Sequence, residues 1–317
     1  MRVLVTGACG QLGMDAVRAL SARGHEVILT DVRPSAELPE LILADLTKED
    51  EARALVASCR PDAVLHCAAW TAVDEAEKPE LYDLVYAVNV RATAFLAGAA
   101  EKAGARFCYI STDYVFDGQG DTPRKPDDCA YSPLNVYGRT KLLGEEAVRA
   151  ACSRYYIVRI AWVFGAHGGN FVQTMLRLGK TREELRVVND QIGTPTYTRD
   201  LAELLSRLLE TGLFGCYHVT NAELPPELDR GDGFTKEGTK VGFISWYDFA
   251  REIFRQAGYT TRVIPVSTEE YGLSRADRPR NSRLDKRRLQ ETGLGPMPDW
   301  RDALRRYLDE TRDTWDR

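Results

Sequence analysis

Short runs of apolar, β-branched residues alternate along the chain with longer stretches in which apolar residues recur every three or four positions. The runs lie at 2–6, 26–30, 62–69, 105–111 and 155–164, and they are continuous rather than alternating. Such runs are typical of strands covered on both faces, as in a parallel sheet. The stretches at 11–24, 83–104 and 133–152 have helical spacing, and the first two end in glycine. The pattern predicts an α/β fold with a doubly wound parallel sheet through about residue 165.

Beyond residue 165 the regularity loosens, and we expect a smaller C-terminal lobe. Helical patterns recur at 198–212 and 244–258, a strand-like run lies at 216–221, and an amphipathic surface helix is expected at 300–315. Residues 222–243 are rich in proline, glycine and charge and have no period. That composition predicts a long inserted loop.

Composition and charge narrow the class of protein. The 317 residues are 44% hydrophobic, enough for a substantial core, and carry a formal net charge of -5. Negative charge disfavours nucleic acid and anionic membranes as partners. No window approaches the roughly 18 continuous apolar residues of a spanning helix, and the chain enters its first strand at once, so we expect no signal peptide and a cytoplasmic location. The seven cysteines contain no CxxC pair, which predicts reduced thiols.

Three glycines, Gly7, Gly10 and Gly13, follow the first predicted strand and open the first predicted helix. Backbone that must turn tightly and approach a pyrophosphate needs glycine, and a helix N-terminus favours the phosphate charge. Asp31 ends the second strand, near the roughly 20-residue offset at which a carboxylate reaches ribose hydroxyls. The sequence therefore predicts a bound dinucleotide. Asp31 alone favours NADH, but Arg33 could pair with the 2′-phosphate of NADPH, so both cofactors stay open.

Tyr137 and Lys141 are four residues apart on a predicted helix, so their side chains project from one face. A phenol with a pKa of about 10 is a weak acid at neutral pH, and a neighbouring ammonium group can lower that pKa by about 1 to 3. Ser111 and Thr112 end the fourth strand, at the carboxyl edge where open α/β sheets bind ligands. We therefore expect Tyr137 to protonate a carbonyl oxygen as hydride arrives, while Thr112 orients that carbonyl.

These motifs resemble those of the extended short-chain dehydrogenase/reductases and, within that family, the dTDP-4-dehydrorhamnose reductases. The resemblance runs almost end to end, through GACGQLG, CAAWTAVDEAE, ISTDYVFDG, PLNVYGRTKLLGE, RIAWVFGAHGGNFVQTML, VVNDQIGTPT and RPRNSRLD. It implies a Rossmann-type fold with a smaller C-terminal substrate-binding lobe. The implied reaction is NAD(P)H-dependent reduction of the 4-keto group of dTDP-4-dehydro-L-rhamnose to dTDP-L-rhamnose. The family pattern passes almost directly from YHVTN to SWYDFA, so 222–243 is an insertion.

The resemblance assigns roles to most of the site. The implied catalytic group is Thr112, Tyr137 and Lys141. The residues implied around the dinucleotide, with Tyr137 and Lys141, are Gly7, Gly10, Gln11, Leu12, Gly13, Asp31, Arg33, Asp45, Leu46, Ala68 and Ala69. Those implied near the sugar nucleotide are Thr71, Val73, Tyr114, Trp162 and Asn170.

Several of these residues have a second interpretation. Asp45 can bind the adenine amino group or cap the helix that follows it. Trp162, at a strand end, can cover a sugar or belong to the core. The basic cluster Arg278, Arg280 and Arg283 can neutralise a substrate diphosphate or form a solvated charged face, and from it we take Arg280 as the substrate contact.

The spacing of the histidines does not predict a metal site. The four histidines, His25, His66, His167 and His218, show no metal-ligand spacing and are expected to be structural. Mg²⁺ is possible from the resemblance, but no residues are assigned to it.

We predict a dinucleotide-binding domain at 1–165, completed by returning segments at about 185–221 and 244–262. The substrate-binding lobe is expected to comprise about 166–184 and 263–317. A homodimer is possible. Two other functions stay open: a reductase or epimerase of another nucleotide sugar, and a non-catalytic regulatory subunit resembling the methionine adenosyltransferase β subunit.

Overall fold

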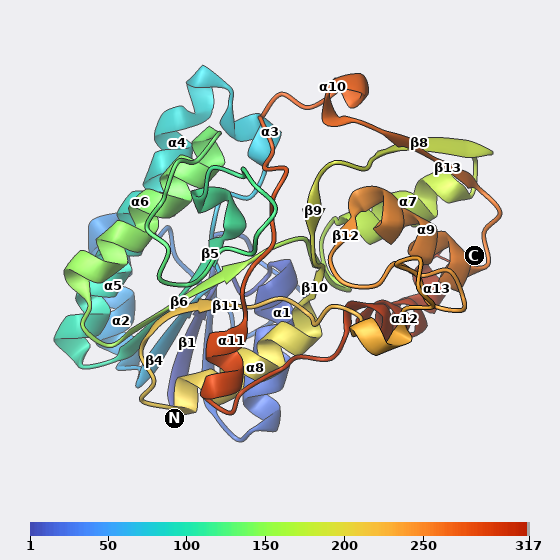
Figure 1. The fold of residues 1–317 in the computed structure, drawn as a ribbon. Coiled ribbons are helices and arrows are strands. Elements are labelled where there is room, and N and C mark those ends of the chain that lie inside the picture. The colour runs from blue at the N-terminus through green and yellow to red at the C-terminus, as the bar shows by residue number, and fades with distance from the viewer. Residues whose placement is uncertain (316–317) are drawn as a thin grey trace.

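The computed structural model describes residues 1–315 and is built on a seven-stranded sheet (Figure 1). The strands are β1 (Arg2–Thr6), β2 (Glu26–Asp31), β3 (Ile42–Leu43), β4 (Ala63–His66), β5 (Arg106–Thr112), β6 (Tyr155–Ile160) and β11 (Gly215–His218). They lie in the order β11-β6-β5-β4-β1-β2-β3, and all neighbouring pairs are parallel. The chain winds outward from β1 in one direction and from β4 in the other, so the predicted doubly wound sheet is confirmed.

Helices cover both faces of the sheet (Figure 1). One face carries α1 (Gln11–Ala22) and α8 (Thr198–Glu210), and the other carries α2 (Glu49–Cys59), α5 (Ala92–Ala103) and α6 (Val136–Ala151). The sequence of strand β1 supplies apolar side chains to both faces of the sheet. Val3 and Val5 pack in the core with α1 and α8, whereas Leu4 packs in the core with α2, α5 and α6. Successive strand side chains point to opposite faces, so a continuous apolar run fills two cores.

The helix expected at 83–104 is divided in the structure. It comprises α4 (Tyr82–Tyr86), a π-helical turn (Ala87–Arg91) and α5, and it follows α3 (Val73–Ala76) and a 3-10 turn (Pro79–Leu81). The π-turn holds the buried Asn89, whose side chain accepts a hydrogen bond from Trp70 N at 2.8 Å and donates one to Thr140 Oγ1 at 3.0 Å. This local widening thereby joins the loop after β4 to α6.

A second core lies beside the carboxyl edge of the sheet. Its helices are α7 (Phe171–Gly179), α9 (Trp246–Ala257), α12 (Trp300–Glu310) and the short α13 (Arg312–Trp315). Its strand pairs are β8 (Glu184–Val188) with β13 (Arg262–Val266), β7 (Val163–Phe164) with β10 (Thr196–Tyr197), and β9 (Ile192–Gly193) with β12 (Ile244–Ser245). Two further short helices, α10 (Thr268–Tyr271) and α11 (Arg287–Glu291), lie in the C-terminal segment.

The predicted assignment of segments to the two lobes differs from the structure. The stretch at 244–262 was expected to return to the first domain, but Phe249 and Ile253 of α9 pack in the second core. Residues 185–188 pair with β13 rather than with the large sheet, so only α8 and β11 return. In the opposite sense, Leu289 of α11 packs in the first domain. Periodicity reveals that a helix has an apolar face, but it does not reveal which partner covers that face.

The helix expected on the surface at 300–315 is amphipathic but contributes fully buried residues. Trp300 and Tyr307 of α12 are inaccessible to solvent and pack in the second core. The opposite face of α12 carries the exposed Arg305 and Asp309, so the expected amphipathic surface helix is confirmed over Trp300–Glu310.

The insertion at 222–243 contains only one short 3-10 turn (Pro226–Leu228), but it is not detached from the fold. Leu224 bridges to Gly242, which closes the segment on itself. Thr239 is buried and donates its hydroxyl to Glu252 Oε2 of α9 at 2.8 Å. The insertion is thus a loop packed on the second lobe.

Within residues 1–315 no helix combines the length and apolar character needed to cross a bilayer.

Candidate active site

The glycine-rich turn at the carboxyl end of β1 has the shape of a phosphate cradle. Gly7 has φ +64°, and a Cβ added there would lie 2.6 Å from Ala68 N. A Cβ on Gly13 would lie 2.1 Å from the Gly7 carbonyl oxygen. Gly10 precedes α1 without a side-chain cap, so the first N–H groups of the helix, at Gln11 and Leu12, are available to an anion. The turn therefore fits the pyrophosphate of a dinucleotide, because only glycine permits this close backbone packing.

Asp31 connects the end of β2 to this turn. Its carboxylate accepts hydrogen bonds from Cys9 N and Arg33 N, both at 3.1 Å. The Asp31 side chain is buried, whereas the Arg33 side chain is 72% exposed. Arg33 Nε lies 3.8 Å from Asp31 Oδ1. A carboxylate beside the glycine turn and an exposed guanidinium at its rim are the groups that a ribose hydroxyl and a 2′-phosphate respectively require.

The remaining predicted dinucleotide residues lie along the same edge. Asp45 accepts from Thr47 N at 3.1 Å and from the Thr47 hydroxyl at 2.6 Å, and the latter bond lowers the pKa of Asp45. The residue preceding α2 is Lys48, so Asp45 is not the helix cap. Leu46 is buried in the core beneath it. Ala68 and Ala69 follow β4, and Ala68 N donates to Thr6 Oγ1 at 3.3 Å.

The three predicted catalytic residues come together between β5 and α6. Thr112 ends β5, and Tyr137 lies in the first turn of α6. Asn135 caps this helix by accepting from Gly138 N at 2.8 Å. A Cβ on Gly138 would lie 2.3 Å from the Tyr114 carbonyl oxygen, so glycine lets α6 approach the strand end.

The electrostatics of the group differ in one respect from the expectation. Lys141 is 2% exposed, and its Nζ lies 4.0 Å from the ring centroid of Tyr109. Burial lowers the pKa of Lys141 to about 7, opposed mainly by the Glu145 carboxylate. Burial raises the pKa of Tyr137, and the Thr112 hydroxyl opposes that rise. In this state Tyr137 is a protonated acid, and the nearby Thr112 hydroxyl favours release of its proton.

The motif analysis missed Asp113. It is buried beside Thr112, whose hydroxyl donates to Asp113 Oδ1 at 3.1 Å, and burial raises the pKa of Asp113 to about 6. A carboxylate in the apolar run ISTDYVF, next to the two strand-end hydroxyls, was the available signal.

Two aromatic residues predicted to contact the substrate lie on different elements. The ring of Tyr114 meets that of Tyr137 edge to face, with centroids 5.7 Å apart. Trp162 follows β6 with φ +52° and stacks on Trp246 of α9, with centroids 3.8 Å apart. A left-handed tryptophan is strained, and such strain concentrates at functional sites. Trp162 is a buried member of the second core, which it extends to the end of β6.

The other predicted substrate residues have partners of their own. Thr71 is exposed after β4, and Val73 begins α3, whose Asp74 binds Arg278 at 2.7 Å. Asn170 caps α7, accepting from Gln173 N at 3.0 Å and donating to the Gly165 carbonyl oxygen at 2.8 Å.

The three arginines of the C-terminal segment do not form one free cationic patch. Arg278 is paired with Asp74, Arg280 with Glu269, and Arg283 bonds Asn281 at 3.0 Å. Arg280 remains 52% exposed and is the most accessible of the three. A diphosphate would therefore have to displace Glu269 from Arg280.

For metals, the side chains of residues 1–315 include no group of three or more His, Cys, Asp and Glu residues placed to hold an ion. His66 instead lies between Thr6 Oγ1, at 2.7 Å, and Thr93 Oγ1, at 3.1 Å. Mg²⁺ accordingly stays without assigned ligands.

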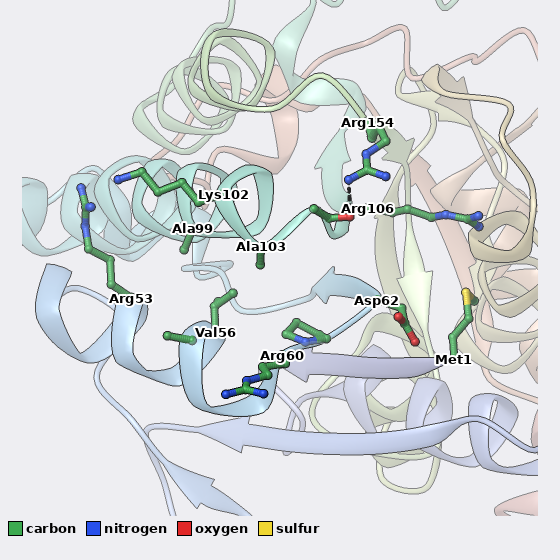
Figure 2. Close-up of a pocket in the computed structure, with 13 residues that line it drawn as sticks. Met1, Arg53, Val56, Arg60, Asp62, Ala99, Lys102, Ala103, Arg106 and Arg154 are labelled. Carbon is green, nitrogen blue, oxygen red and sulfur yellow. Dashed lines mark hydrogen bonds between the residues drawn. The ribbon is translucent and has the colours of Figure 1, made fainter.

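A large cavity of about 950 Å³ lies at the opposite, amino edge of the sheet (Figure 2). Its rim is basic, but several of the cations are already engaged. Arg53 pairs with Glu49, Arg106 binds the Leu209 and Thr211 carbonyls, and Arg154 binds the Gly104 carbonyl. In Figure 2 the side chain of Arg106 extends away from the other cations. This cavity contains none of the catalytic group.

The doubly wound sheet, the glycine turn beneath Asp31 and the Thr112, Tyr137 and Lys141 group define an extended short-chain dehydrogenase/reductase. A family model described as "RmlD substrate binding domain" matches residues 1–313. The chain therefore belongs to the family that this model describes.

Two relatives and one solved structure illustrate the similarity. The chain is 40% identical to the spore coat polysaccharide biosynthesis protein SpsK of Bacillus subtilis, covering 98% of this chain and 97% of that protein. It is 37% identical to the dTDP-4-dehydrorhamnose reductase of Escherichia coli, covering 98% of each. The crystal structure of dTDP-4-dehydrorhamnose reductase from Bacillus anthracis in complex with NADP superposes with a TM-score of 0.84 at 38% identity, covering 98% of this chain and 99% of that one.

Proposed function

We propose that the protein reduces the 4-keto group of dTDP-4-dehydro-L-rhamnose with NADPH or NADH to give dTDP-L-rhamnose. The observation that carries the proposal is the assembly of Thr112, Tyr137 and Lys141 at the same sheet edge as the glycine turn. Relatives that bear the name of this reductase, at 37 to 38% identity over nearly the whole chain, support the choice of substrate.

The reaction adds a hydride to the carbonyl carbon and a proton to its oxygen. The reduced dinucleotide supplies the hydride when bound. Tyr137, which burial keeps protonated, donates the proton to the carbonyl oxygen. Thr112 orients that oxygen through its hydroxyl, and the ammonium form of Lys141 stabilises the phenolate left on Tyr137.

For the dinucleotide, the residues fall into three groups by position. The glycine turn and the first N–H groups of α1 hold the pyrophosphate, and Asp31 binds the adenosine ribose. Asp45 and Leu46 border the adenine, and Ala68 and Ala69 border the path toward the nicotinamide. Arg33 makes NADPH acceptable because its exposed guanidinium can pair with the 2′-phosphate. The relative solved with NADP supports use of the phosphorylated cofactor.

For the sugar nucleotide, we assign the residues that border the junction of the two lobes. Tyr114 and Trp162 cover the sugar with their rings, and Arg280 binds the diphosphate. The residues that line the approach to this site are Thr71, Val73 and Asn170.

The test is turnover by the purified protein with the 4-keto sugar nucleotide generated in the same tube. Consumption of NADPH or NADH with dTDP-L-rhamnose as product is the expected result, and the two KM values rank the cofactors. A panel of other nucleotide 4-keto sugars serves as the comparison. Dinucleotide binding without consumption of any substrate would contradict the proposal and favour the regulatory-subunit alternative.

Three accompanying expectations are checked with the same preparation. We expect turnover to survive a metal chelator, because no ligand set for Mg²⁺ is found among residues 1–315. Light scattering tests the predicted homodimer. A cytoplasmic location, where nucleotide sugars are made, is tested by cell fractionation.

A further inference from the structure

A fully buried ion pair lies next to the catalytic group. Glu145 stands one helical turn after Lys141 on α6, and Arg159 lies on β6, and neither side chain is accessible to solvent. Arg159 Nε donates to Glu145 Oε1 at 2.8 Å, and Arg159 Nη2 donates to Oε2 at 2.7 Å. Burying such a pair costs desolvation, and apolar replacements are often neutral or stabilising. Stability alone therefore does not account for this pair.

Glu145 also binds the strand that carries Thr112. The Ser111 hydroxyl donates to Glu145 Oε1 at 2.6 Å, and Ser111 stands directly opposite Arg159 in the β5–β6 register. Side chains two apart on a strand share a face, and Tyr109 and Ser111 of β5 both meet α6, Tyr109 at the Lys141 carbonyl and Ser111 at Glu145. One carboxylate thus joins the end of β5 to the helix that supplies the acid.

Arg159 extends the same network to the loop after β5. Its Nη2 donates to the Tyr131 hydroxyl at 2.7 Å, and its Nη1 lies 3.3 Å from His218 Nε2. His218 Nδ1 is 2.9 Å from the Arg124 carbonyl oxygen, so Nδ1 carries the proton and Nε2 accepts. Every polar group of the pair is satisfied, which makes the arrangement rigid.

Glu145 is charged at neutral pH, whereas the other titratable groups around Lys141 are not. The titratable groups that face Lys141 are Glu145 and Tyr137 of α6, Tyr109 of β5, and His66 and Cys67 at the end of β4. At neutral pH the others are uncharged, because burial lowers the pKa of His66 to about 3 and raises those of Cys67, Tyr109 and Tyr137. The groups that face Glu145 in turn are Ser111, Tyr109, Arg149, Arg159 and Cys216.

We propose that Glu145 is a positioning residue of the reaction. Through Ser111 and Arg159 it fixes the strand bearing Thr112 against the helix bearing Tyr137 and Lys141, and it places a carboxylate one helical turn from Lys141. This inference rests on the proposed reductase function.

The test compares two substitutions that change the charge near Lys141 in opposite directions. Glu145→Gln removes the carboxylate, so Lys141 loses its proton at lower pH and the alkaline limb of kcat moves down by about 1 pH unit. Arg149→Met removes a cation that bonds Glu145 Oε2 at 2.8 Å, so the limb moves up. The proposal would be overturned if the alkaline limb of kcat is unchanged in Glu145→Gln, or if it moves in the same direction in Glu145→Gln and Arg149→Met. A fall in kcat alone would not rescue it.

The positioning role of Glu145 is tested by removing only the Ser111 hydroxyl. Ser111→Ala leaves the ion pair intact but frees the strand end, and we expect kcat to fall about tenfold with little change in KM. The matched control is Ser206→Ala on α8, which removes an equally buried hydroxyl bonded to the Glu203 carbonyl, away from the site. Equal kcat values in Ser111→Ala and wild type would contradict the positioning role.

Two further measurements separate this inference from folding and from the reaction itself. If Glu145→Gln does not fold, the double variant Glu145→Leu with Arg159→Met removes the carboxylate together with its buried partner. Its alkaline limb must still move down, but by less, because loss of the Arg159 cation opposes loss of the carboxylate. Titration of the Lys141 side chain by NMR, with Lys141→Arg identifying the signal, needs no turnover. A wild type without turnover would refute the reductase, whereas an Lys141 titration unmoved by loss of Glu145 would refute this inference.

Discussion

Tyr137 is held as a neutral phenol by the protein around it. Burial raises its pKa, the Thr112 hydroxyl opposes that rise, and its ring packs against that of Tyr114. A phenol in this setting gives up its proton only when a carbonyl oxygen develops negative charge beside it. The same burial lowers the pKa of Lys141 to about 7, so acid and cation are poised at neutral pH.

The first prediction concerns that phenolic proton. Tyr137→Phe keeps the ring but removes the acid, and we expect kcat to fall by roughly 10² to 10⁴-fold while dinucleotide affinity is unchanged. Steady-state kinetics and fluorescence titration measure the two quantities. Tyr156→Phe is the control, since it removes a buried tyrosine hydroxyl that bonds the Thr211 carbonyl instead. Near-normal turnover in Tyr137→Phe would refute the assignment of the acid.

The second prediction compares two glycines in the left-handed region. Gly7 has φ +64° and Gly24 has φ +76°, so alanine costs roughly 1 to 2 kcal/mol of backbone strain at either position. Only at Gly7 would the new Cβ also meet backbone, 2.6 Å from Ala68 N. Gly7→Ala should therefore weaken dinucleotide binding by about tenfold or more, and Gly24→Ala should not. Equal affinities in calorimetry would argue against the cradle.

Residue positions were more predictable from the sequence than side-chain partners. Gly7, Thr112, Tyr137 and Lys141 were identified because their chemistry depends on spacing and on the ends of strands. Whether Arg280 pairs with Glu269 could not be read from the chain, because that contact depends on how α10 is placed beside the C-terminal segment.

At the scale of elements, helix ends organise the site. Asn135 caps α6 just before Tyr137, and Asn170 caps α7 at the border of the substrate side. A side-chain oxygen that accepts an N–H of the first turn fixes both the start of a helix and the direction from which the chain enters it.

The third prediction tests the cap of α7. Asn170→Ala leaves Gln173 N without its acceptor and should lower the free energy of unfolding by about 1 kcal/mol. Asn170→Asp retains the acceptor and should recover most of that loss. Urea unfolding monitored by circular dichroism measures both variants. If alanine and aspartate were equally destabilising, the cap would not be the stabilising contact at this position.

Elements of the first domain were predicted well because each strand run and helix follows the last in a regular βαβ order. The same reasoning failed for α9, which was assigned to the first domain although Phe249 and Ile253 complete the second core. Its apolar face is equally compatible with either core. Similarly, Trp162 could not be placed from sequence, because its stacking partner Trp246 lies on an element distant in the chain.

At the scale of the whole molecule, buried ionisable groups couple stability to pH. Burial lowers the pKa of His66 and His218 to about 3, well below the ordinary 6.5. Both are neutral in the folded state, so unfolding takes up protons below pH 6.5. Asp113 acts in the opposite sense, because burial raises its pKa to about 6 and the folded state holds its proton more tightly.

The fourth prediction follows from these signs. The stability that the two neutral histidines contribute is complete above about pH 6.5 and is lost as the pH falls, because unfolding then takes up two protons. Asp113 stabilises the folded state only below about pH 6, where unfolding releases its proton. The net slope from these three groups is about 1.4 kcal/mol per pH unit between pH 6 and 4. Denaturant unfolding across this range measures it. His66→Gln should flatten the slope, and a stability that rises as pH falls would contradict the account.

The central claim is that the two lobes bring a 4-keto sugar nucleotide to the reduced dinucleotide beside Tyr137. The most direct measurement follows deuterium from NADPH carrying the label at the transferable position. We predict that dTDP-4-dehydro-L-rhamnose is converted to dTDP-L-rhamnose with one deuterium at C4 of the sugar, matched by one oxidised dinucleotide. A product without deuterium at C4, or a dinucleotide that stays reduced while the substrate is unchanged or epimerised, would contradict the account.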